Sequence, residues 1–373
     1  MNLAQRQEEL QRQFKLGIDT KLENSPVEIR HFPYTSLDED KGEKAGGSDS
    51  DILENREFVY PIFKLKSQDK CPGAIFLMHG LNERSWNKYL CWAEYLCMHT
   101  GKAVVLLPIA FHINRSPLSW LNPRLISPIL EKRRQILGKE QSQSIANTIL
   151  SERLSEDPKR FYRSGKQSLS DLTGLVRQIK EGRHPLFTSG TGVDFFAYSI
   201  GAFLVQIALL SDKEGLLEDS GLFLFCGGSI FKQMNGTSRF IMDKLTFDKL
   251  CDYYLYRFES DNRIDQTSEA SMIAFNTMIE KERGAEERYR IFNEMGNKIQ
   301  VMALKKDSVI PYNGIVEALG TECAQRNSSL IDFPYEYSHE QPFPIMKGQK
   351  EQNDLVNLCF NGVFSQAAAF LSK

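Results

Sequence analysis

The stretch VDFFAYSIGAFLVQIALL, residues 193–210, places a serine between two apolar segments. The residues before Ser199 have the length and composition of a buried strand, and those after it have the length and composition of a buried helix. Ala197 and Gly201, two positions on either side of the serine, are small enough for the backbone to turn sharply there. The stretch therefore predicts a tight strand–turn–helix connection that presents the Ser199 hydroxyl above the end of a strand.

Further apolar runs along the chain are typical of strands that helices cover on both faces. They are GAIFLMHG (73–80), AVVLLPIAF (103–111), GLFLFCGG (221–228), IQVMALKKD (299–307) and SLIDFPYEYSH (329–339). Two earlier runs, VEIRHFPYT (27–35) and FVYPIFKLK (58–66), alternate apolar and polar residues, as half-exposed antiparallel strands at an edge do. With the strand before Ser199, these runs predict an α/β fold with a mostly parallel sheet of about eight strands.

The spacing of the predicted strands divides the chain. Residues 1–26 are expected to form a helical N-terminal extension, and residues 27–373 an α/β domain. Two intervals, at about 113–165 and 229–298, are too long for a single crossover helix and are rich in helix formers, so we interpret them as helical cap insertions. The polar Gly- and Ser-rich stretch 36–55 is expected to be a loop.

Charge and hydropathy narrow the class of protein. The chain has 46 basic and 48 acidic residues, so no overall field attracts nucleic acid. The N-terminus has no apolar core of a secretory signal, and no apolar run is long enough for a membrane span. We therefore expect a cytoplasmic protein that acts on a small molecule. Its oligomeric state stays open.

The cysteines indicate neither disulfides nor a metal site. The chain has seven cysteines and no C-x-x-C pair, which favours reduced thiols in the core. Cys91, Cys97 and His99 come closest to the spacing of zinc ligands, but on a helix they fall on different faces. No metal and no organic cofactor is expected.

An acid and a histidine follow Ser199 at the ends of two later predicted strands. Asp307 comes directly after IQVMAL, and His339 closes SLIDFPYEYSH. With the turn at Ser199, this order resembles the α/β-hydrolase superfamily, most closely its uncharacterised bacterial members, over nearly the whole chain from about residue 27. The resemblance implies that Ser199 is the nucleophile, His339 the base and Asp307 the acid that orients it. Asp332 and Glu340 are weaker candidates for the acid because they lie so close to His339 in sequence.

The resemblance also assigns an oxyanion hole, and the stretch FLMHGLNERSW, residues 76–86, supplies half of it. The backbone N–H of Leu81 is one donor by analogy, and the N–H of Ile200 at the start of the helix is the other. Gly80 lets the backbone turn, and His79 is expected to support the loop. His112 is expected to be a packed loop histidine, with a place at the mouth of the site as the alternative.

These residues predict a serine hydrolase that cleaves an ester, thioester or amide through an acyl-enzyme. The alternative is a non-catalytic protein of the same fold that binds a ligand or partner in the hydrolase pocket. The three residues Ser199, Asp307 and His339 argue against it, since a binding protein has no need of all of them.

The first insertion carries an excess of positive charge. Its ten basic residues are Arg115, Arg124, Lys132, Arg133, Arg134, Lys139, Arg153, Lys159, Arg160 and Arg163, against the five acidic residues Glu131, Glu140, Glu152, Glu156 and Asp157. We expect this insertion to form a lid above Ser199, with Trp120 and Leu121 walling an acyl pocket. The basic residues form either a solvated helix face or a site that prefers substrates with a carboxylate or phosphate.

Overall fold

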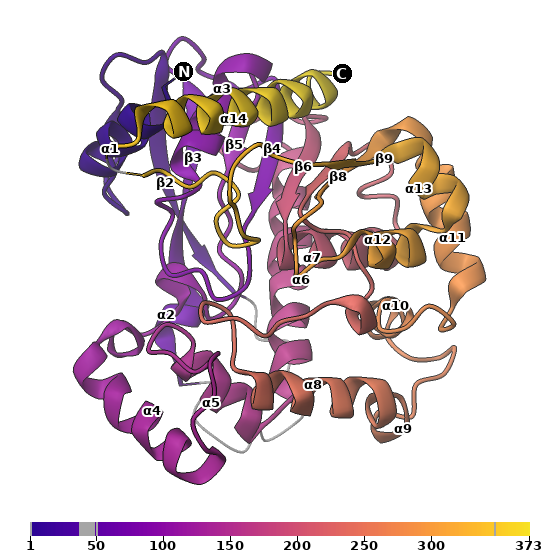
Figure 1. Cartoon of the computed structure of the whole chain (residues 1–373). Helices are drawn as coiled ribbons and strands as arrows, with labels where there is room; N and C mark the ends of the chain where they lie inside the picture. The colour runs from indigo at the N-terminus through magenta and orange to yellow at the C-terminus, as the bar shows by residue number, and fades with distance from the viewer. Residues whose placement is uncertain (1, 37–48, 50, 347) are drawn as a thin grey trace.

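A single sheet of nine strands runs through the part of the chain that this computed structural model describes, residues 2–36, 49, 51–346 and 348–373 (Figure 1). The strands are β1 (Thr20–Lys21), β2 (Val27–Thr35), β3 (Glu57–Leu65), β4 (Gly73–Met78), β5 (Ala103–Val105), β6 (Gly192–Tyr198), β7 (Leu222–Phe225), β8 (Ile299–Leu304) and β9 (Ser328–Ile331). Their spatial order is β1-β2-β3-β5-β4-β6-β7-β8-β9. The strands from β5 to β9 pair in parallel, whereas β1, β2, β3 and β5 pair with one another antiparallel.

This sheet confirms the predicted mostly parallel α/β architecture, and its strand order together with the turn after β6 is that of the α/β-hydrolase fold. The predicted number of eight strands was short by one. The additional strand, β1, lies in the extension predicted as helical, where Thr20 and Lys21 pair with Ile29 and Glu28 of β2. A strand of two residues carries no periodicity, so its pairing partner alone defines it.

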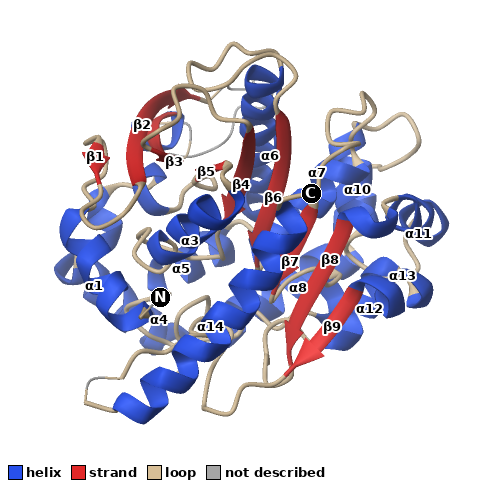
Figure 2. Ribbon diagram, turned by 90° about the horizontal axis from the view of Figure 1, so that it is seen from above, coloured by secondary structure: helices blue, strands red, loops and turns tan. Residues whose placement is uncertain are grey.

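The central strands have apolar side chains on both faces of the sheet. Ala74 and Phe76 of β4 face one hydrophobic core, and Ile75 and Leu77 face another. The first core is completed by α6 (Lys159–Lys180) and α7 (Ile200–Leu210), and the second by α3 (Leu90–Thr100) and α14 (Lys350–Leu371). Figure 2 shows the strands between these helices. Successive side chains of a strand point to opposite faces, so an apolar run without alternation requires this three-layer arrangement.

Fourteen α-helices are present in the described residues. They are α1 (Leu3–Gln13), α2 (Leu53–Arg56), α3 (Leu90–Thr100), α4 (Pro123–Leu137), α5 (Thr148–Glu156), α6 (Lys159–Lys180), α7 (Ile200–Leu210), α8 (Lys244–Tyr256), α9 (Phe258–Asp261), α10 (Ala270–Thr277), α11 (Ala285–Glu294), α12 (Tyr312–Leu319), α13 (Thr321–Asn327) and α14 (Lys350–Leu371). Four 3₁₀ turns join them, η1 (Ile113–Arg115), η2 (Leu118–Leu121), η3 (Phe231–Gln233) and η4 (Gly296–Lys298). No helix in this part of the chain is both long and apolar enough to cross a membrane.

The predicted elements differ from the observed ones at their ends. The run 103–111 forms a strand only over Ala103–Val105, and the run 329–339 contributes only as far as Ile331. Proline interrupts both runs, at Pro108 and Pro334, and has no backbone N–H for a ladder. β3 is largely buried rather than half exposed, because its side chains pack into the cores on both faces of the sheet, Tyr60 and Ile62 into one and Phe63 into the other.

The predicted loop at 36–55 falls mostly outside the described residues, and its last residues begin α2. The two long intervals contain helices and no strand of the sheet among their described residues. Helices α4 and α5 come from the first interval and α8 from the second, and the three lie together at one end of the molecule (Figure 1, lower part).

Candidate active site

The turn between β6 and α7 holds Ser199 in a strained backbone conformation. Its φ is 57° and its ψ is −124°, a region that residues with a Cβ rarely adopt. Gly201 makes the turn possible, since a Cβ there would lie 2.9 Å from the carbonyl oxygen of His79 and 2.7 Å from the Cβ of Met78. The sharp turn predicted from the small residues around Ser199 is therefore confirmed.

Ser199, His339 and Asp307 lie in one hydrogen-bonded line. The Ser199 Oγ is 2.7 Å from Nε2 of His339, and the His339 Nδ1 is 2.8 Å from Oδ2 of Asp307. A carboxylate only accepts, so Nδ1 carries the proton, and the lone pair of the neutral imidazole is on Nε2, facing the serine hydroxyl. All three side chains are buried.

The loop after β8 fixes the carboxylate. Oδ1 of Asp307 accepts hydrogen bonds from the backbone N–H groups of Val309 (2.9 Å) and Ile310 (2.8 Å), which leaves Oδ2 for His339. The other two acids considered from the sequence bind elsewhere. Asp332 is exposed and accepts from the Tyr337 hydroxyl, and Glu340 accepts from the Ser238 hydroxyl.

Tyr198 packs against the His339 ring, a contact that the sequence analysis did not predict. Its ring stacks on the His339 ring with centroids 5.4 Å apart and planes at 16°, and its hydroxyl donates to the His339 carbonyl. A buried tyrosine before the serine looks like an ordinary strand residue. The contact becomes visible only in the folded chain, where the loop after β9 brings His339 against Tyr198.

The loop after β4 passes close to Ser199, since a Cβ on Gly80 would lie 3.5 Å from the Ser199 Cβ. Gly80 lies against the Tyr198 ring, where a Cβ would be 3.1 Å from Cε1. His79 braces the loop, because its Nε2 accepts from the Ile109 N–H at 2.9 Å while its Nδ1 lies 2.8 Å from the Gly80 carbonyl oxygen. Burial lowers the pKa of His79 to about 4, so this imidazole is neutral near pH 7.

Two backbone N–H groups remain available at the site. Among the residues that the structure describes, neither the N–H of Leu81 nor that of Ile200 has a hydrogen-bond partner. Both residues line the same pocket as Ser199. Ile200 is also the first residue of α7, where the helix dipole favours negative charge.

The pocket that contains Ser199, here called the serine pocket, is apolar. Its other lining residues are Leu81, Phe161, Ile200, Phe231, Met234, Gly236, Ile241, Met242, Phe247, Leu250, Val309 and Ile310. A second apolar pocket continues from Leu81, Phe161 and Ile200 along α7 to Phe203 and Ile207. Both long intervals, 113–165 and 229–298, thus contribute walls to the site. The sequence led us to expect Trp120 and Leu121 as walls of the serine pocket, and that prediction is wrong. Both residues line a neighbouring pocket instead.

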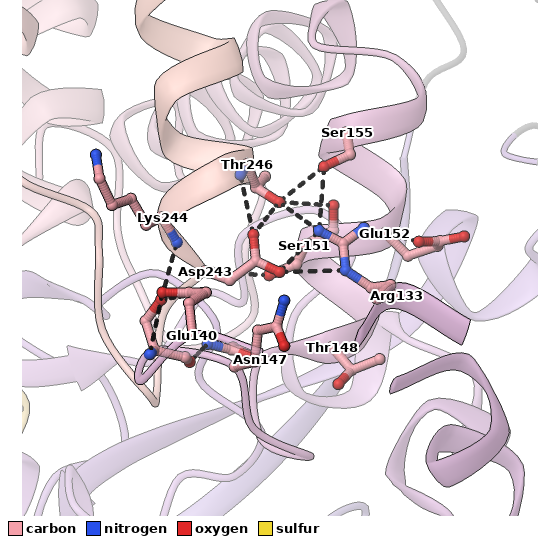
Figure 3. A network of polar contacts seen from close by, with 12 residues as sticks. Arg133, Glu140, Asn147, Thr148, Ser151, Glu152, Ser155, Asp243, Lys244 and Thr246 are labelled. Carbon is pink, nitrogen blue, oxygen red and sulfur yellow. Dashed lines mark hydrogen bonds and ion pairs between the residues drawn. The ribbon is translucent and has the colours of Figure 1, made fainter. Parts of the chain in front are cut away.

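A buried polar network joins the two insertions (Figure 3). Arg133 of α4 forms a salt bridge of 2.7 Å with Asp243, the N-cap residue of α8, and also contacts Glu152 of α5. The same Asp243 carboxylate accepts from the N–H and hydroxyl of Thr246 at 2.9 Å and 2.6 Å. The network therefore holds α4, α5 and α8 in one arrangement.

Removing one charge from this network is expected to destabilise the protein. Asp243→Ala leaves the buried Arg133 guanidinium with the half-exposed Glu152 as its carboxylate partner and without the buried one, and breaking such a buried pair costs about 3–5 kcal/mol. The free energy of unfolding, measured by urea titration, checks this. The control is Asp248→Ala on the same helix, which breaks an exposed pair with Lys244 and should change stability little. Equal effects of the two substitutions would contradict the role given to the network.

No group of three or more His, Cys, Asp or Glu side chains in the described ranges is arranged to hold a metal ion. The seven cysteines are all free, and five of them are buried. Burial raises the pKa of Cys71 to about 11, so this thiol is protonated and unreactive at neutral pH. His112 is packed in its loop and also borders the apolar pocket along α7.

Comparisons with known proteins identify one family and a set of similar solved structures. A family model described as "Family of unknown function (DUF6051)" matches residues 40–372. No curated protein matches the chain. Among solved structures, the chain is similar to a cold-adapted esterase from an Arctic intertidal metagenomic library, with 10% identity over 96% of this chain and 98% of that chain and a TM-score of 0.43. It is also similar to carboxyl esterase 2 from the mycorrhizal fungus Tuber melanosporum (9% identity, 97% of each chain, TM-score 0.47) and to a thermostable esterase from Pseudomonas putida (9% identity, 94% and 85%, TM-score 0.42).

Proposed function

We propose that this chain, which belongs to the family of unknown function DUF6051, is a serine hydrolase that cleaves an ester bond of a small molecule through an acyl-enzyme. One observation carries the proposal: the Ser199 hydroxyl lies 2.7 Å from a histidine nitrogen whose ring is oriented by a buried carboxylate. A serine hydroxyl is a weak nucleophile at neutral pH, and this arrangement is what activates it.

The steps follow from which atoms carry protons. Nε2 of His339 takes the Ser199 proton as Oγ attacks the ester carbonyl carbon, and the imidazolium that forms is stabilised by Asp307. The same proton then passes to the alcohol oxygen as the ester bond breaks, which leaves the acyl group on Ser199. Water, deprotonated by His339, attacks the acyl-enzyme, and His339 returns that proton to Oγ of Ser199 as the acid is released.

The oxyanion of each tetrahedral intermediate needs donors that are in place before the reaction. The free N–H groups of Leu81 and Ile200 are our candidates, since each lines the serine pocket without a partner among the described residues. Removing a single donor of this kind costs about 10²–10³ in kcat in well-studied hydrolases. Both donors are backbone groups, so their position depends on the loop that His79 and Gly80 hold.

The walls of the serine pocket favour an ester with an apolar acyl group over a peptide. Of the described residues that line it, Ser199 alone has a polar side chain. A peptide substrate needs hydrogen-bond partners for its own backbone, whereas an alkyl or aryl acyl group gains from burial alone, by about 25 cal/mol per Å². In this proposal the insertions at about 113–165 and 229–298 are caps that enclose that group.

A fluorophosphonate probe tests the proposal, because it reacts with a serine only where a base and an oxyanion hole activate it. We expect one covalent adduct per chain, located on Ser199 by peptide mass spectrometry, and no adduct in Ser199→Ala. A folded wild-type protein that stays unlabelled would contradict the proposal and support a ligand-binding protein with a hydrolase fold.

A further inference from the structure

Three guanidinium groups line a pocket beside the serine pocket. Arg84, Arg153 and Arg160 line it together with the rings of Phe111 and Trp120, and we call it the arginine pocket. It shares the lining residues Leu81 and Phe161 with the serine pocket, so the two pockets are adjacent. An ester long enough to extend past these two side chains would reach both.

Arg84 faces this pocket without a carboxylate. Its guanidinium donates to two backbone carbonyls, of Trp120 at 3.4 Å and of Ala146, and forms no ion pair with a described residue. The neighbouring Glu83 does not compensate it, because its carboxylate binds Lys88 and accepts from the Tyr89 hydroxyl. Arg84 is carried by the same loop as Leu81, and the carbonyls of Trp120 and Ala146 hold its guanidinium in place.

Arg153 is held rigidly between two rings. Its guanidinium carbon lies 4.5 Å from the centroid of Phe111 and 4.2 Å from that of Trp120. Only its Nη2 is paired within the described part of the chain, at 3.0 Å from Asp49. The same carboxylate oxygen also serves Arg160, at 2.9 Å from its Nε. Arg160 also pairs with Glu156, so Asp49 and Glu156 together serve these two guanidinium groups, and Arg84 is the one left without a carboxylate among the described residues.

The positive charge of the pocket is therefore in excess, and burial makes it costly. Burial lowers the pKa of both Arg84 and Arg153, which means that their charged forms lack full compensation in the protein. His112, which also lines the pocket, adds no charge, because burial lowers its pKa to about 3. An anion in the pocket would supply the missing partner. The arginines stay charged whether or not an anion occupies the pocket.

We propose that the arginine pocket binds an anionic oxygen group of the ester substrate, a carboxylate or a phosphate, with Arg84 and Arg153 as the binding residues. This inference rests on the proposed function, since it places the rest of the same ester at Ser199. The planar fork of each guanidinium suits both kinds of group, and the rings of Phe111 and Trp120 prevent Arg153 from turning away.

The test compares esters that differ in one anionic group. The first pair is the p-nitrophenyl monoester of glutaric acid and p-nitrophenyl pentanoate, and the second is the butyrate ester of 3-hydroxypropyl phosphate and propyl butyrate. For at least one pair we expect the wild-type kcat/KM to favour the anionic ester by roughly tenfold or more at low salt. The ratio should fall as the salt concentration rises.

Variants assign that ratio to the pocket. Arg84→Gln is expected to bring the ratio close to one, and Arg84→Lys to retain part of it, because lysine keeps the charge but not the fork. Arg257→Gln is the matched control, since this arginine is exposed and paired with Asp252, and it should leave the ratio unchanged. Ratios near one for both pairs in a wild-type protein that hydrolyses the neutral esters overturn this inference and leave the proposed function intact.

Binding provides a readout that does not need turnover. The same uncleaved esters are titrated calorimetrically into Ser199→Ala, where we expect the anionic member of the favoured pair to bind about tenfold more tightly than the neutral one. That difference should disappear in Ser199→Ala with Arg84→Gln. Equal dissociation constants for both pairs overturn the inference, whether or not the wild-type protein is an esterase.

Discussion

Ser199→Ala is expected to lower kcat for an ester substrate by roughly four to six orders of magnitude, because the proposed mechanism has no other nucleophile. The alanine methyl group fits the space of the serine side chain, so the fold should persist although the hydrogen bond to Nε2 of His339 is lost. The measurements are kcat with a p-nitrophenyl ester and the melting temperature of the two proteins. Activity above a tenth of the wild-type value would contradict the assignment of Ser199.

The matched control is Ser220→Ala. Ser220 is a buried serine whose hydroxyl has no hydrogen-bond partner in the described residues, and it does not line the serine pocket. Its substitution removes the same atom from a similar environment, so kcat should be unchanged. A comparable loss of activity in both variants would indicate a general effect on the fold rather than the loss of a nucleophile.

The line of Ser199, His339 and Asp307 could be predicted because each residue lies at the C-terminal side of a strand, Ser199 directly after β6, and Asp307 and His339 in the loops after β8 and β9. The C-terminal ends of neighbouring parallel strands meet at one edge of a sheet, so residues far apart in sequence are brought together by strand order alone. The periodicity of the strands and the small residues around Ser199 carry that information locally. The residue-by-residue roles came from the resemblance to the superfamily.

Contacts made across the fold could not be predicted in the same way. The stacking of Tyr198 on His339 and the contact of the Arg84 guanidinium with the Trp120 and Ala146 carbonyls depend on where loops return, and no local pattern records this. Strand β1 was missed for a similar reason, since its two residues are defined only by their partner β2.

The arginines of the first insertion show that composition cannot predict the role of a single charged residue. Of its arginines, Arg115 and Arg133 are buried in ion pairs with Asp171 and Asp243 and serve the fold. Arg153 and Arg160 line the arginine pocket, whereas Arg84, which joins them there, lies outside the insertion. A count of charges cannot separate these groups, because an arginine that stabilises a core and one that faces a pocket look alike in sequence. The closing of the insertion as a lid stays a prediction.

The environment of Asp307 determines what a change from carboxylate to amide does. Oδ1 accepts from two backbone N–H groups, of Val309 and Ile310, and Oδ2 accepts from Nδ1 of His339. In Asp307→Asn the single carbonyl oxygen is drawn to the two N–H groups, so the NH₂ group faces the histidine. An NH₂ group only donates, so Nδ1 must then present its lone pair and Nε2 must carry the proton.

A histidine with its proton on Nε2 cannot accept the proton of Ser199, so Asp307→Asn is expected to lower kcat by about 10⁴ while the side-chain volume and the fold are preserved. The measurement is kcat with a p-nitrophenyl ester across the pH range, with the melting temperature as the check on folding. Asp332→Asn is the control, since this carboxylate is exposed and bound to Tyr337, and it should leave kcat unchanged. If Asp307→Asn stays within tenfold of wild type, or if Asp332→Asn causes the larger loss, then His339 is oriented by another group and the assignment of Asp307 is wrong.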